Sequence, residues 1–320
     1  MNLAPATPTS IHLAAEIIRN GNLVAFPTET VYGLGADALS APACAKIFAA
    51  KNRPHFDPLI VHVAEVEGIE KICARFDGRT RQLVEKFWPG PLTLVVPKTE
   101  LVPDLVTAGL LNVALRMPDH TVALALIRAA QTPIAAPSAN PFGYLSPTTA
   151  QHVAEQLGSK VDLILDGGPC PVGVESTILD LSMATPRLLR LGGLPLEMLE
   201  PILGRLEIFA SDPTRPLAPG QLPSHYAPHT PVEFLPENES HIATGKKIGL
   251  LAFQNLPEHL IFAAIEILSP QGNLQEAAAN LFSCLHRLDR AGLDLIYAEP
   301  VPEMGLGRAI MDRLRKAAAK

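Results

Sequence analysis

The sequence predicts a mixed α/β protein built from two domains. Strand and helix patterns alternate in parts of residues 1–210, and strands follow one another directly elsewhere. This arrangement favours a mixed, twisted open sheet with helices over a purely parallel sheet. The 320 residues are enough for two domains of roughly 150 residues each. Pro, Ser, His and Gly are concentrated in 211–231, which we interpret as a linker. A smaller, Rossmann-like α/β domain is expected over 232–320.

The elements of the first domain are predicted from hydrophobic spacing and from Gly and Pro, which interrupt regular structure. The first helix, residues 10–20, has Ser10 as its expected N-cap and Gly21 as its stop. The other predicted helices cover 40–50, 80–87, 121–130, 149–157 and 196–203. The predicted strands cover 23–26, 59–63, 92–96, 112–116, 134–136, 163–166, 177–181 and 187–191.

The second domain shows the same two kinds of pattern. Apolar runs predict strands over 232–235, 248–253, 261–268 and 293–298. Residues 274–290 have the spacing of a long amphipathic helix, and 306–319 that of a basic terminal helix.

Charge and cysteine content exclude several classes of protein. The net charge of −6 argues against a protein that holds long nucleic acid by neutralising phosphates. Four cysteines lie far apart without a C-x-x-C pair, which favours reduced thiols over a disulfide framework or a zinc site. No signal pattern and no run of about 18 apolar residues occurs. We therefore expect a cytoplasmic protein without a membrane segment.

Polar residues follow the strand 23–26 at the point where it ends. Pro27 interrupts the strand because it has no N–H to donate. Two threonines, a carboxylate and a phenol follow over 28–32, and Gly33 and Gly35 come next. Glycines let the backbone approach a ligand closely or turn sharply. These residues predict a binding loop, although an ordinary strand-to-loop junction has a similar composition.

Four basic residues at the ends of elements are candidates for binding an anion. Lys51 and Arg53 follow a predicted helix, and Arg116 and Arg190 each end a predicted strand. The chain contains neither a G-x-x-x-x-G-K-[ST] nor a G-x-G-x-x-G phosphate loop. Side chains would therefore have to hold a nucleotide, because Arg binds phosphate or carboxylate through paired hydrogen bonds and Lys supplies a point charge. Solvated surface positions are the alternative for each of them.

Small polar residues at strand ends form a second set of candidates, Ser138, Asn140, Ser146 and Ser176. Turn and cap roles are the alternative for these residues. His62 lies in an apolar strand, where a hydrogen-bonded core imidazole fits the pattern as well as a catalytic base does. No G-x-S-x-G and no metal-ligand spacing occurs, so no metal site is predicted. These patterns alone indicate a small-molecule site on an α/β sheet.

Eight motifs occur in the order found in the YrdC family of threonylcarbamoyl-AMP synthases, which the chain resembles over about residues 8–205. They are Pro27-Thr28-Glu29-Thr30-Val31-Tyr32-Gly33-Leu34-Gly35, Lys51-Asn52-Arg53-Pro54, Pro58-Leu59-Ile60-Val61-His62, Trp88-Pro89-Gly90-Pro91-Leu92-Thr93, Arg116-Met117-Pro118, Pro137-Ser138-Ala139-Asn140, Gly173-Val174-Glu175-Ser176-Thr177 and Arg190-Leu191-Gly192-Gly193. Ala218-Pro219-Gly220 and His225-Tyr226-Ala227-Pro228 resemble the linker of the longer, two-domain branch. Residues 232–320 look like the C-terminal domain of that branch.

This resemblance implies the synthesis of L-threonylcarbamoyl-AMP from L-threonine, bicarbonate or CO2, and ATP, with release of pyrophosphate. Such a nucleotidyltransferase would pass its product to separate tRNA threonylcarbamoyl-transfer proteins, which modify an adenosine beside the anticodon. Weak binding of tRNA itself would fit this role. Mg²⁺ is expected to arrive with ATP.

The resemblance also implies a role for individual residues. Those expected to bind L-threonine are Thr30, His62, Arg116, Ala136 and Ser176. Those expected to bind ATP are Lys51, Arg53, Asp57, Val113, Ser138, Asn140, Ser146, Arg190 and Tyr226. Lys51, Arg53 and Arg190 are the expected catalytic residues, because the reaction needs positioning and charge neutralisation rather than a covalent nucleophile.

The linker is expected to act as a lid over this site. Its six prolines stiffen residues 211–231, and Tyr226 offers an aromatic ring to cover a ligand. A passive spacer is the alternative. Two other functions stay open: a YrdC-type domain serving a different carbamoyl transfer, and a non-enzymatic RNA-binding protein that uses the concave face of the sheet.

Overall fold

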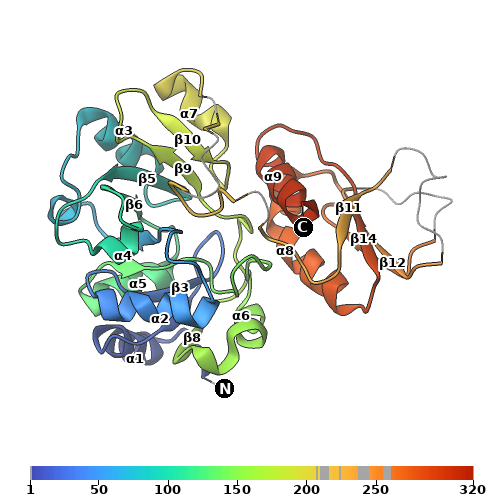
Figure 1. Cartoon of the computed structure of the whole chain (residues 1–320), viewed down its shortest axis with the longest axis horizontal. Helices are drawn as coiled ribbons and strands as arrows, with labels where there is room; N and C mark the ends of the chain where they lie inside the picture. The colour runs from blue at the N-terminus through green and yellow to red at the C-terminus, as the bar shows by residue number, and fades with distance from the viewer. Residues whose placement is uncertain are drawn as a thin grey trace.

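A ten-stranded mixed sheet is the frame of the larger of two units, at the left of Figure 1. Its strands lie in the order β1 (Leu3–Pro5), β8 (Leu163–Asp166), β2 (Val24–Phe26), β3 (Gly33–Asp37), β7 (Ile134–Ala135), β4 (Ile60–His62), β6 (Asn112–Arg116), β5 (Leu92–Pro97), β9 (Thr177–Asp180) and β10 (Arg187–Arg190). Strands β4 and β6 run parallel, whereas β5 and β6 run antiparallel. The predicted mixed α/β sheet is therefore confirmed.

Helices cover both faces of this sheet. One face packs against α1 (Pro8–Arg19) and α5 (Thr121–Ala130), and the other against α2 (Ala41–Lys51), α3 (Gly78–Phe87) and α6 (Ala150–Leu157). Successive side chains of β2 alternate between the two cores: Phe26 joins the first and Ala25 the second. Two further helices, α4 (Asp104–Thr107) and α7 (Leu196–Leu203), and the 3-10 turns Ile69–Lys71 and Gly158–Lys160 complete the unit.

A four-stranded parallel sheet forms the smaller unit, with the strand order β11 (Val232–Phe234), β14 (Leu295–Ala298), β12 (Ile248–Ala252) and β13 (Ala264–Ile267). Helices α8 (Leu274–Arg290) and α9 (Gly307–Ala318) share an apolar core with this sheet. Figure 1 shows these two helices between the small sheet and the larger unit. The helical face of the smaller unit is therefore the face that meets the larger one.

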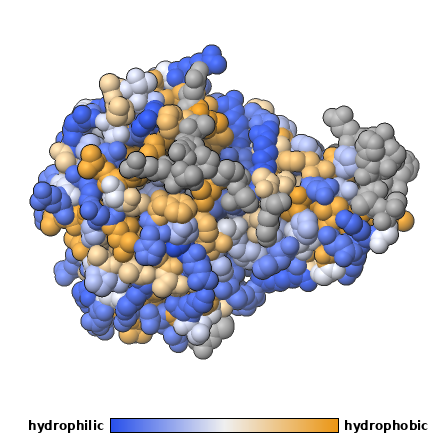
Figure 2. Space-filling view, in the orientation of Figure 1, coloured by the Kyte–Doolittle hydropathy of each residue, from blue (hydrophilic) through white to orange (hydrophobic). Residues whose placement is uncertain are grey.

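The computed structural model describes residues 2–206, 208–209, 216–222, 225–236, 245–254 and 261–319. Parts of the predicted linker, 211–215 and 223–224, lie outside these residues. Figure 2 shows a larger and a smaller lobe, with hydrophilic and hydrophobic residues intermixed over the larger one. Among the described helices, none combines the length and the apolar character that a bilayer crossing requires.

Helix α1 begins earlier than predicted, and the assignment of Ser10 as its N-cap is wrong. Thr7 is the N-cap, and the Ser10 N–H donates to its hydroxyl at 3.2 Å. The Thr7 N–H donates in turn to the Ser10 hydroxyl at 2.9 Å, which makes a reciprocal capping box. Pro8 can take the first helical position because the N–H at that position would have no intrahelical partner.

Residues Gly33–Asp37, predicted as part of a loop, form strand β3 between β2 and β7. A Cβ at Gly35 would lie 2.7 Å from Phe26 Cε1 and 2.8 Å from Ile134 Cγ2. Glycine therefore lets two large neighbours pack over the strand, and its function here is close packing rather than a sharp turn.

Candidate active site

A cavity of about 40 Å³ lies where several loops and strand ends of the larger unit meet the linker. Nine residues predicted to bind substrate line it: Thr30, Arg53, His62, Arg116, Ala136, Ser138, Ser176, Arg190 and Tyr226. They come from segments that span almost 200 residues of sequence. The sheet order explains their convergence, because β3, β7, β4 and β6 are consecutive strands and end or begin at the cavity.

Five other predicted residues lie behind this lining. Lys51 and Asn140 meet through the Lys51 ammonium group, and Asp57 pairs with Arg53. Ser146 donates its hydroxyl hydrogen to Glu175 Oε1 at 2.5 Å. Val113 is different, because it is a buried core residue of β6. The proposed nucleotide contact of Val113 stays a prediction.

Thr28 organises the loop that carries Thr30. Its hydroxyl donates to the Val31 carbonyl at 2.7 Å and accepts the N–H groups of Thr30 and Val31, both at 3.2 Å. The Thr28 and Thr30 hydroxyls lie 2.8 Å apart. This local network is a turn closed by a side chain, and it fixes the position of Thr30 at the cavity.

Lys51 is the last residue of α2 and is 1% exposed. Asn52 ends the helix in the left-handed conformation, at φ 53°, and turns the chain so that Arg53 enters the cavity. The Lys51 ammonium group donates to the Ser138 carbonyl at 2.5 Å and to the Asn140 carbonyl. Burial lowers the pKa of Lys51 well below its usual value, and the charge of Arg53 lowers it further.

Arg53 is held by an acid and by two carbonyls. Its guanidinium lies 2.9 Å from Asp57 Oδ2, and it donates to the backbone carbonyls of Asp57 at 3.1 Å and Pro58 at 2.7 Å. Burial raises the pKa of Asp57, although Arg53 and Lys51 oppose this shift. The pair therefore holds the arginine fork in one orientation at the cavity wall.

Arg116 and His62 are neighbours because β6 and β4 pair in register at these two residues. Arg116 Nη2 lies 2.7 Å from Glu29 Oε2, and Arg116 Nε donates to the Gly90 carbonyl at 3.3 Å. Burial, together with the Arg116 charge, lowers the pKa of His62 to about 3. His62 is thus neutral near pH 7, and its Nδ1 has no hydrogen-bond partner among the described residues.

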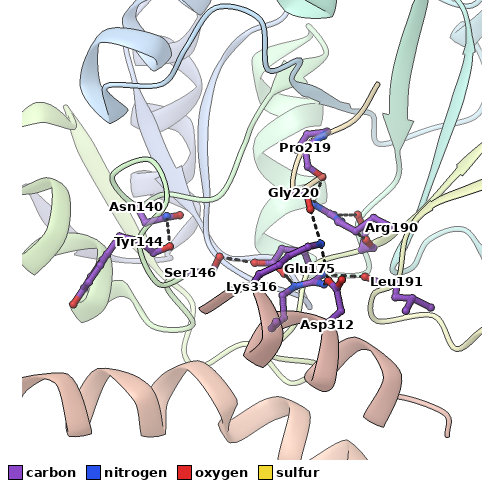
Figure 3. A network of polar contacts seen from close by, with 12 residues as sticks. Asn140, Tyr144, Ser146, Glu175, Arg190, Leu191, Pro219, Gly220, Asp312 and Lys316 are labelled. Carbon is purple, nitrogen blue, oxygen red and sulfur yellow. Dashed lines mark hydrogen bonds and ion pairs between the residues drawn. The ribbon is translucent and has the colours of Figure 1, made fainter. Parts of the chain in front are cut away.

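Arg190 ends β10 and holds the residue that precedes β9. Its Nε and Nη2 donate to the Ser176 carbonyl at 3.0 and 2.8 Å, and Nη1 donates to the Pro219 carbonyl at 3.2 Å. The Ser176 hydroxyl also contacts Thr93 at 2.7 Å. Arg190 therefore joins the sheet to the linker, as Figure 3 shows for its contact with Pro219.

Lys51 and Arg190 share an unusual property. Within the described part of the chain, no carboxylate lies within ion-pair distance of either side chain, although both are buried. Burying a cation opposite neutral carbonyls costs free energy unless a negative charge arrives. The site is therefore suited to an anion with several oxygens, and the arginine forks around it are suited to phosphate or carboxylate.

The linker closes the cavity. Gly220, His225 and Tyr226 line it, and the two aromatic side chains are 6% and 2% exposed. Burial and four nearby cations lower the pKa of His225 well below its usual value. Its Nδ1 has no hydrogen-bond partner among the described residues. The segment is thus packed into the site in this structure.

Sequence reasoning missed three charged residues that support the site, Glu29, Glu175 and Arg313. Arg313 comes from α9 of the smaller unit and donates to Glu175 Oε2 at 2.7 Å. Burial alone would raise the pKa of Glu175, but the charges of Arg313 and Arg190 outweigh it and lower the pKa. One signal was available: Arg313 lies on the apolar face of α9, three residues after Ile310 and one before Leu314.

Comparison with known proteins identifies both parts of the chain. Residues 16–192 match the family model described as telomere recombination, which covers the Sua5, YciO and YrdC proteins. Residues 194–319 match the model of the threonylcarbamoyl-AMP synthase C-terminal domain.

Full-length relatives agree with these matches. The threonylcarbamoyl-AMP synthase of Pyrococcus abyssi is 46% identical over 96% of this chain and 93% of its own length. The Bacillus subtilis threonylcarbamoyl-AMP synthase is 42% identical over 95% and 92%. A crystal structure of P. abyssi Sua5 complexed with L-threonine superposes with a TM-score of 0.90, at 45% identity over 99% of this chain and 96% of that one. This chain therefore belongs to the threonylcarbamoyl-AMP synthase family, in its two-domain form.

Proposed function

We propose that this protein is an adenylyl-transferring enzyme that makes L-threonylcarbamoyl-AMP from L-threonine, bicarbonate or CO2, and ATP. The observation that carries the proposal is the pair of buried cations, Lys51 and Arg190, that face neutral carbonyls beside a cavity lined by Arg53 and Arg116. A triphosphate and an amino-acid carboxylate supply the negative charges that this arrangement requires.

In the proposed threonine site, Arg116 binds the carboxylate. Arg116 Nε already donates to the Gly90 carbonyl, whereas Nη2 is close to Glu29 but makes no hydrogen bond within the described part of the chain, so the guanidinium keeps donors for a carboxylate. Thr30, His62 and Ser176 meet the hydroxyl and the amine. The Ala136 N–H already donates to the Ile60 carbonyl at 2.9 Å, so the Ala136 carbonyl is the group that would accept from the amine.

In the proposed reaction, the threonine nitrogen attacks the carbon of CO2 and loses a proton, which gives a carbamate. If bicarbonate is used, it first takes up a proton and loses water to give CO2. A carbamate oxygen then attacks the α-phosphorus of ATP, and pyrophosphate leaves. Lys51, Arg53, Ser138 and Arg190 would neutralise and orient the phosphates, which is the main contribution a protein makes to this kind of transfer.

The other nucleotide contacts would come from Asp57, Val113, Asn140 and Ser146. Mg²⁺ would arrive on the phosphates of ATP. The nearest carboxylates that we describe, those of Glu29, Asp57 and Glu175, are each paired with an arginine, so they are poorly placed to act as metal ligands.

We further propose that the linker is a lid. A cavity of about 40 Å³ cannot hold ATP, since small-molecule pockets measure roughly 300–1,000 Å³. Gly220, His225 and Tyr226 must move outward before the nucleotide binds. Their return would shield the mixed anhydride from water. The packed, buried state of these residues favours a lid over a passive spacer.

The product would be passed to tRNA threonylcarbamoyl-transfer proteins for modification of the adenosine beside the anticodon, the function known for this family. Weak tRNA binding would assist that transfer. We place the reaction in the cytoplasm, where buried free thiols such as Cys44 and Cys170 stay reduced.

Pyrophosphate release tests the proposal. It should require ATP, threonine and bicarbonate together, and Arg190→Met should abolish most of it. Arg128→Ala is the matched control, because Arg128 is exposed, forms its ion pair with exposed Glu65 and does not line the cavity. Release that is independent of threonine or bicarbonate would contradict the proposal. Salt-dependent tRNA binding without pyrophosphate release would favour a non-enzymatic RNA-binding function instead.

A further inference from the structure

Helix α9 of the smaller unit contacts the linker directly. The Lys316 ammonium group donates to the Gly220 carbonyl at 2.8 Å and lies 2.9 Å from Asp312 Oδ2, one turn earlier on the same helix. The His225 N–H donates to the Lys316 carbonyl at 3.4 Å. Figure 3 shows Lys316 reaching toward Gly220 from this helix. Helix α9 thus contacts the linker at two of the residues that line the cavity, Gly220 and His225.

Arg313, one turn before Lys316, contacts both the linker and the cavity rim. Its side chain is 1% exposed, and its guanidinium lies 4.7 Å from the centre of the Tyr226 ring. Arg313 Nε donates to Glu175 at 2.7 Å, and Nη2 donates to the Leu191 carbonyl at 3.0 Å. A cation over an aromatic face is attractive, more so where water is excluded.

A short relay connects these contacts to the proposed nucleotide site. Glu175 accepts from Arg313 through one oxygen and from the Ser146 hydroxyl through the other, at 2.5 Å. Figure 3 shows Ser146 and Glu175 joined in this way. If Ser146 turns to a nucleotide, it releases one of the groups that fix Glu175, and Glu175 is the anchor of Arg313. The nucleotide site and α9 are therefore physically connected.

We propose that α9 is a latch that holds the linker closed, with Lys316 and Arg313 as positioning residues that act through Gly220 and Tyr226. The smaller unit thereby regulates access of ATP to the site. This inference rests on the proposed function, since it assumes that ATP is the ligand admitted. A latch changes the apparent affinity for ATP in one direction. It lowers this affinity, because only the open fraction of molecules can bind ATP. Weakening it should make ATP bind more tightly.

Lys316→Met tests the direction of this change in ATP affinity, because it removes the contact with Gly220 and keeps much of the aliphatic chain. The apparent Kd for ATP, measured by calorimetry without threonine, is expected to fall about fivefold to tenfold. Hydrogen exchange of the peptide 216–222 is expected to become faster by a similar factor. Arg315→Met is the matched control, since Arg315 is on the same helix but pairs with exposed Glu303. An unchanged or higher Kd in Lys316→Met, or an equal gain in Arg315→Met, overturns the latch.

Arg313→Lys provides a second variant. It keeps the charge but loses the fork that joins Glu175 to the Leu191 carbonyl. If α9 is a latch, this variant should show faster hydrogen exchange in the linker and a lower Kd for ATP. Circular dichroism would check that the fold is unchanged. A loss of ATP affinity in both variants would mean that these residues only support the site, and would refute the latch.

Neither measurement requires turnover. If the wild-type protein binds ATP but releases no pyrophosphate, the proposed function fails and the latch is still decided by the two Kd values. If it does not bind ATP, the proposed function also fails. The exchange rate of 216–222 in Lys316→Met then decides whether α9 holds the linker, and an unchanged rate refutes the latch.

Discussion

Replacing Gly220 by alanine should open the lid, and the structure gives the size of the effect. Gly220 has φ +79°, a conformation that costs alanine about 1 kcal/mol or more. Its Cβ would lie 2.4 Å from the Tyr226 hydroxyl oxygen and 3.1 Å from Arg190 Cδ. Such overpacking typically costs about 1–3 kcal/mol. The closed state should therefore lose about 2–4 kcal/mol.

Tyr226 cannot relieve this clash by a small rotation. Its side chain is 2% exposed and is packed between Arg313 on one side and the rings of His225 and Phe282. Most of the strain therefore acts on the linker as a whole. Because about 1.4 kcal/mol is a factor of ten, the closing equilibrium should weaken by roughly 30-fold to 1,000-fold.

Two measurements check the effect of Gly220→Ala, and the two measured quantities, ATP affinity and product recovery, should change in opposite directions. ATP should bind at least about tenfold more tightly, because the fraction of open molecules rises. Product retention should become worse, so less threonylcarbamoyl-AMP is recovered per pyrophosphate released, since water reaches the anhydride. Gly109→Ala is the control: it has φ +77° and nothing within 4 Å of the added Cβ. If Gly220→Ala matches wild type in both measurements, the packed linker is not a lid.

Three further outcomes are expected. Arg53→Ala should lower kcat/KM for ATP by about 2–4 kcal/mol of transition-state stabilisation, and an unchanged value would remove Arg53 from the phosphate site. Valine should be a much poorer substrate than serine, because Thr30, His62 and Ser176 would lose a hydroxyl partner, so valine turnover at the serine rate would contradict the pocket. The free energy of unfolding should fall as the pH drops from about 6.5 toward 4, by up to about 1.4 kcal/mol per pH unit for each of three histidines. Burial lowers the pKa of His62 and His286 to about 3 and that of His152 to about 4, so the unfolded chain takes up protons first; a urea-unfolding series that is flat over this range would refute this reasoning.

Local patterns were sufficient where an element is stabilised by its own sequence. Helices α5, α7 and α8 begin and end where hydrophobic spacing predicts, because the amphipathic period and the flanking polar, Pro or Gly residues act within a few positions. The start of α1 was misplaced because Thr7 and Ser10 can both cap a helix. Only the reciprocal bonds between them show which residue is the N-cap.

Long-range pairing was not predictable from these patterns. The sequence does not directly indicate that Gly33–Asp37 is a strand between β2 and β7. Glycine has a low strand propensity, so Gly33 and Gly35 favour a loop prediction. The structure shows that glycine is required at Gly35 because the Phe26 ring packs against it. The strand order that places His62 beside Arg116 is likewise set by pairings between residues more than 50 positions apart.

The candidate site was predicted mainly by motifs, and its supporting charges were not. The sequence predicts no more for Glu29 than a polar position in a loop, yet its carboxylate lies 2.7 Å from Arg116. The pattern of 306–319 predicts a basic terminal helix, but Arg313 of this helix is buried and pairs with Glu175 of the larger unit. The ion pairs Arg116–Glu29 and Arg313–Glu175 join residues distant in sequence, so spacing along the chain does not identify the two partners.

The environment of Lys51 has a consequence for protons. Its ammonium group faces two carbonyls, and burial holds its pKa well below the usual value before any ligand arrives. A bound triphosphate would supply the missing negative charge and raise that pKa again. ATP binding and the protonation of Lys51 should therefore favour each other, and ATP affinity should decline as the pH rises through the pKa of this lysine. Calorimetry in buffers of different ionisation enthalpy would measure the protons exchanged on ATP binding, and Lys51→Met should exchange fewer, so the charge of this lysine would be coupled to the occupancy of the phosphate site.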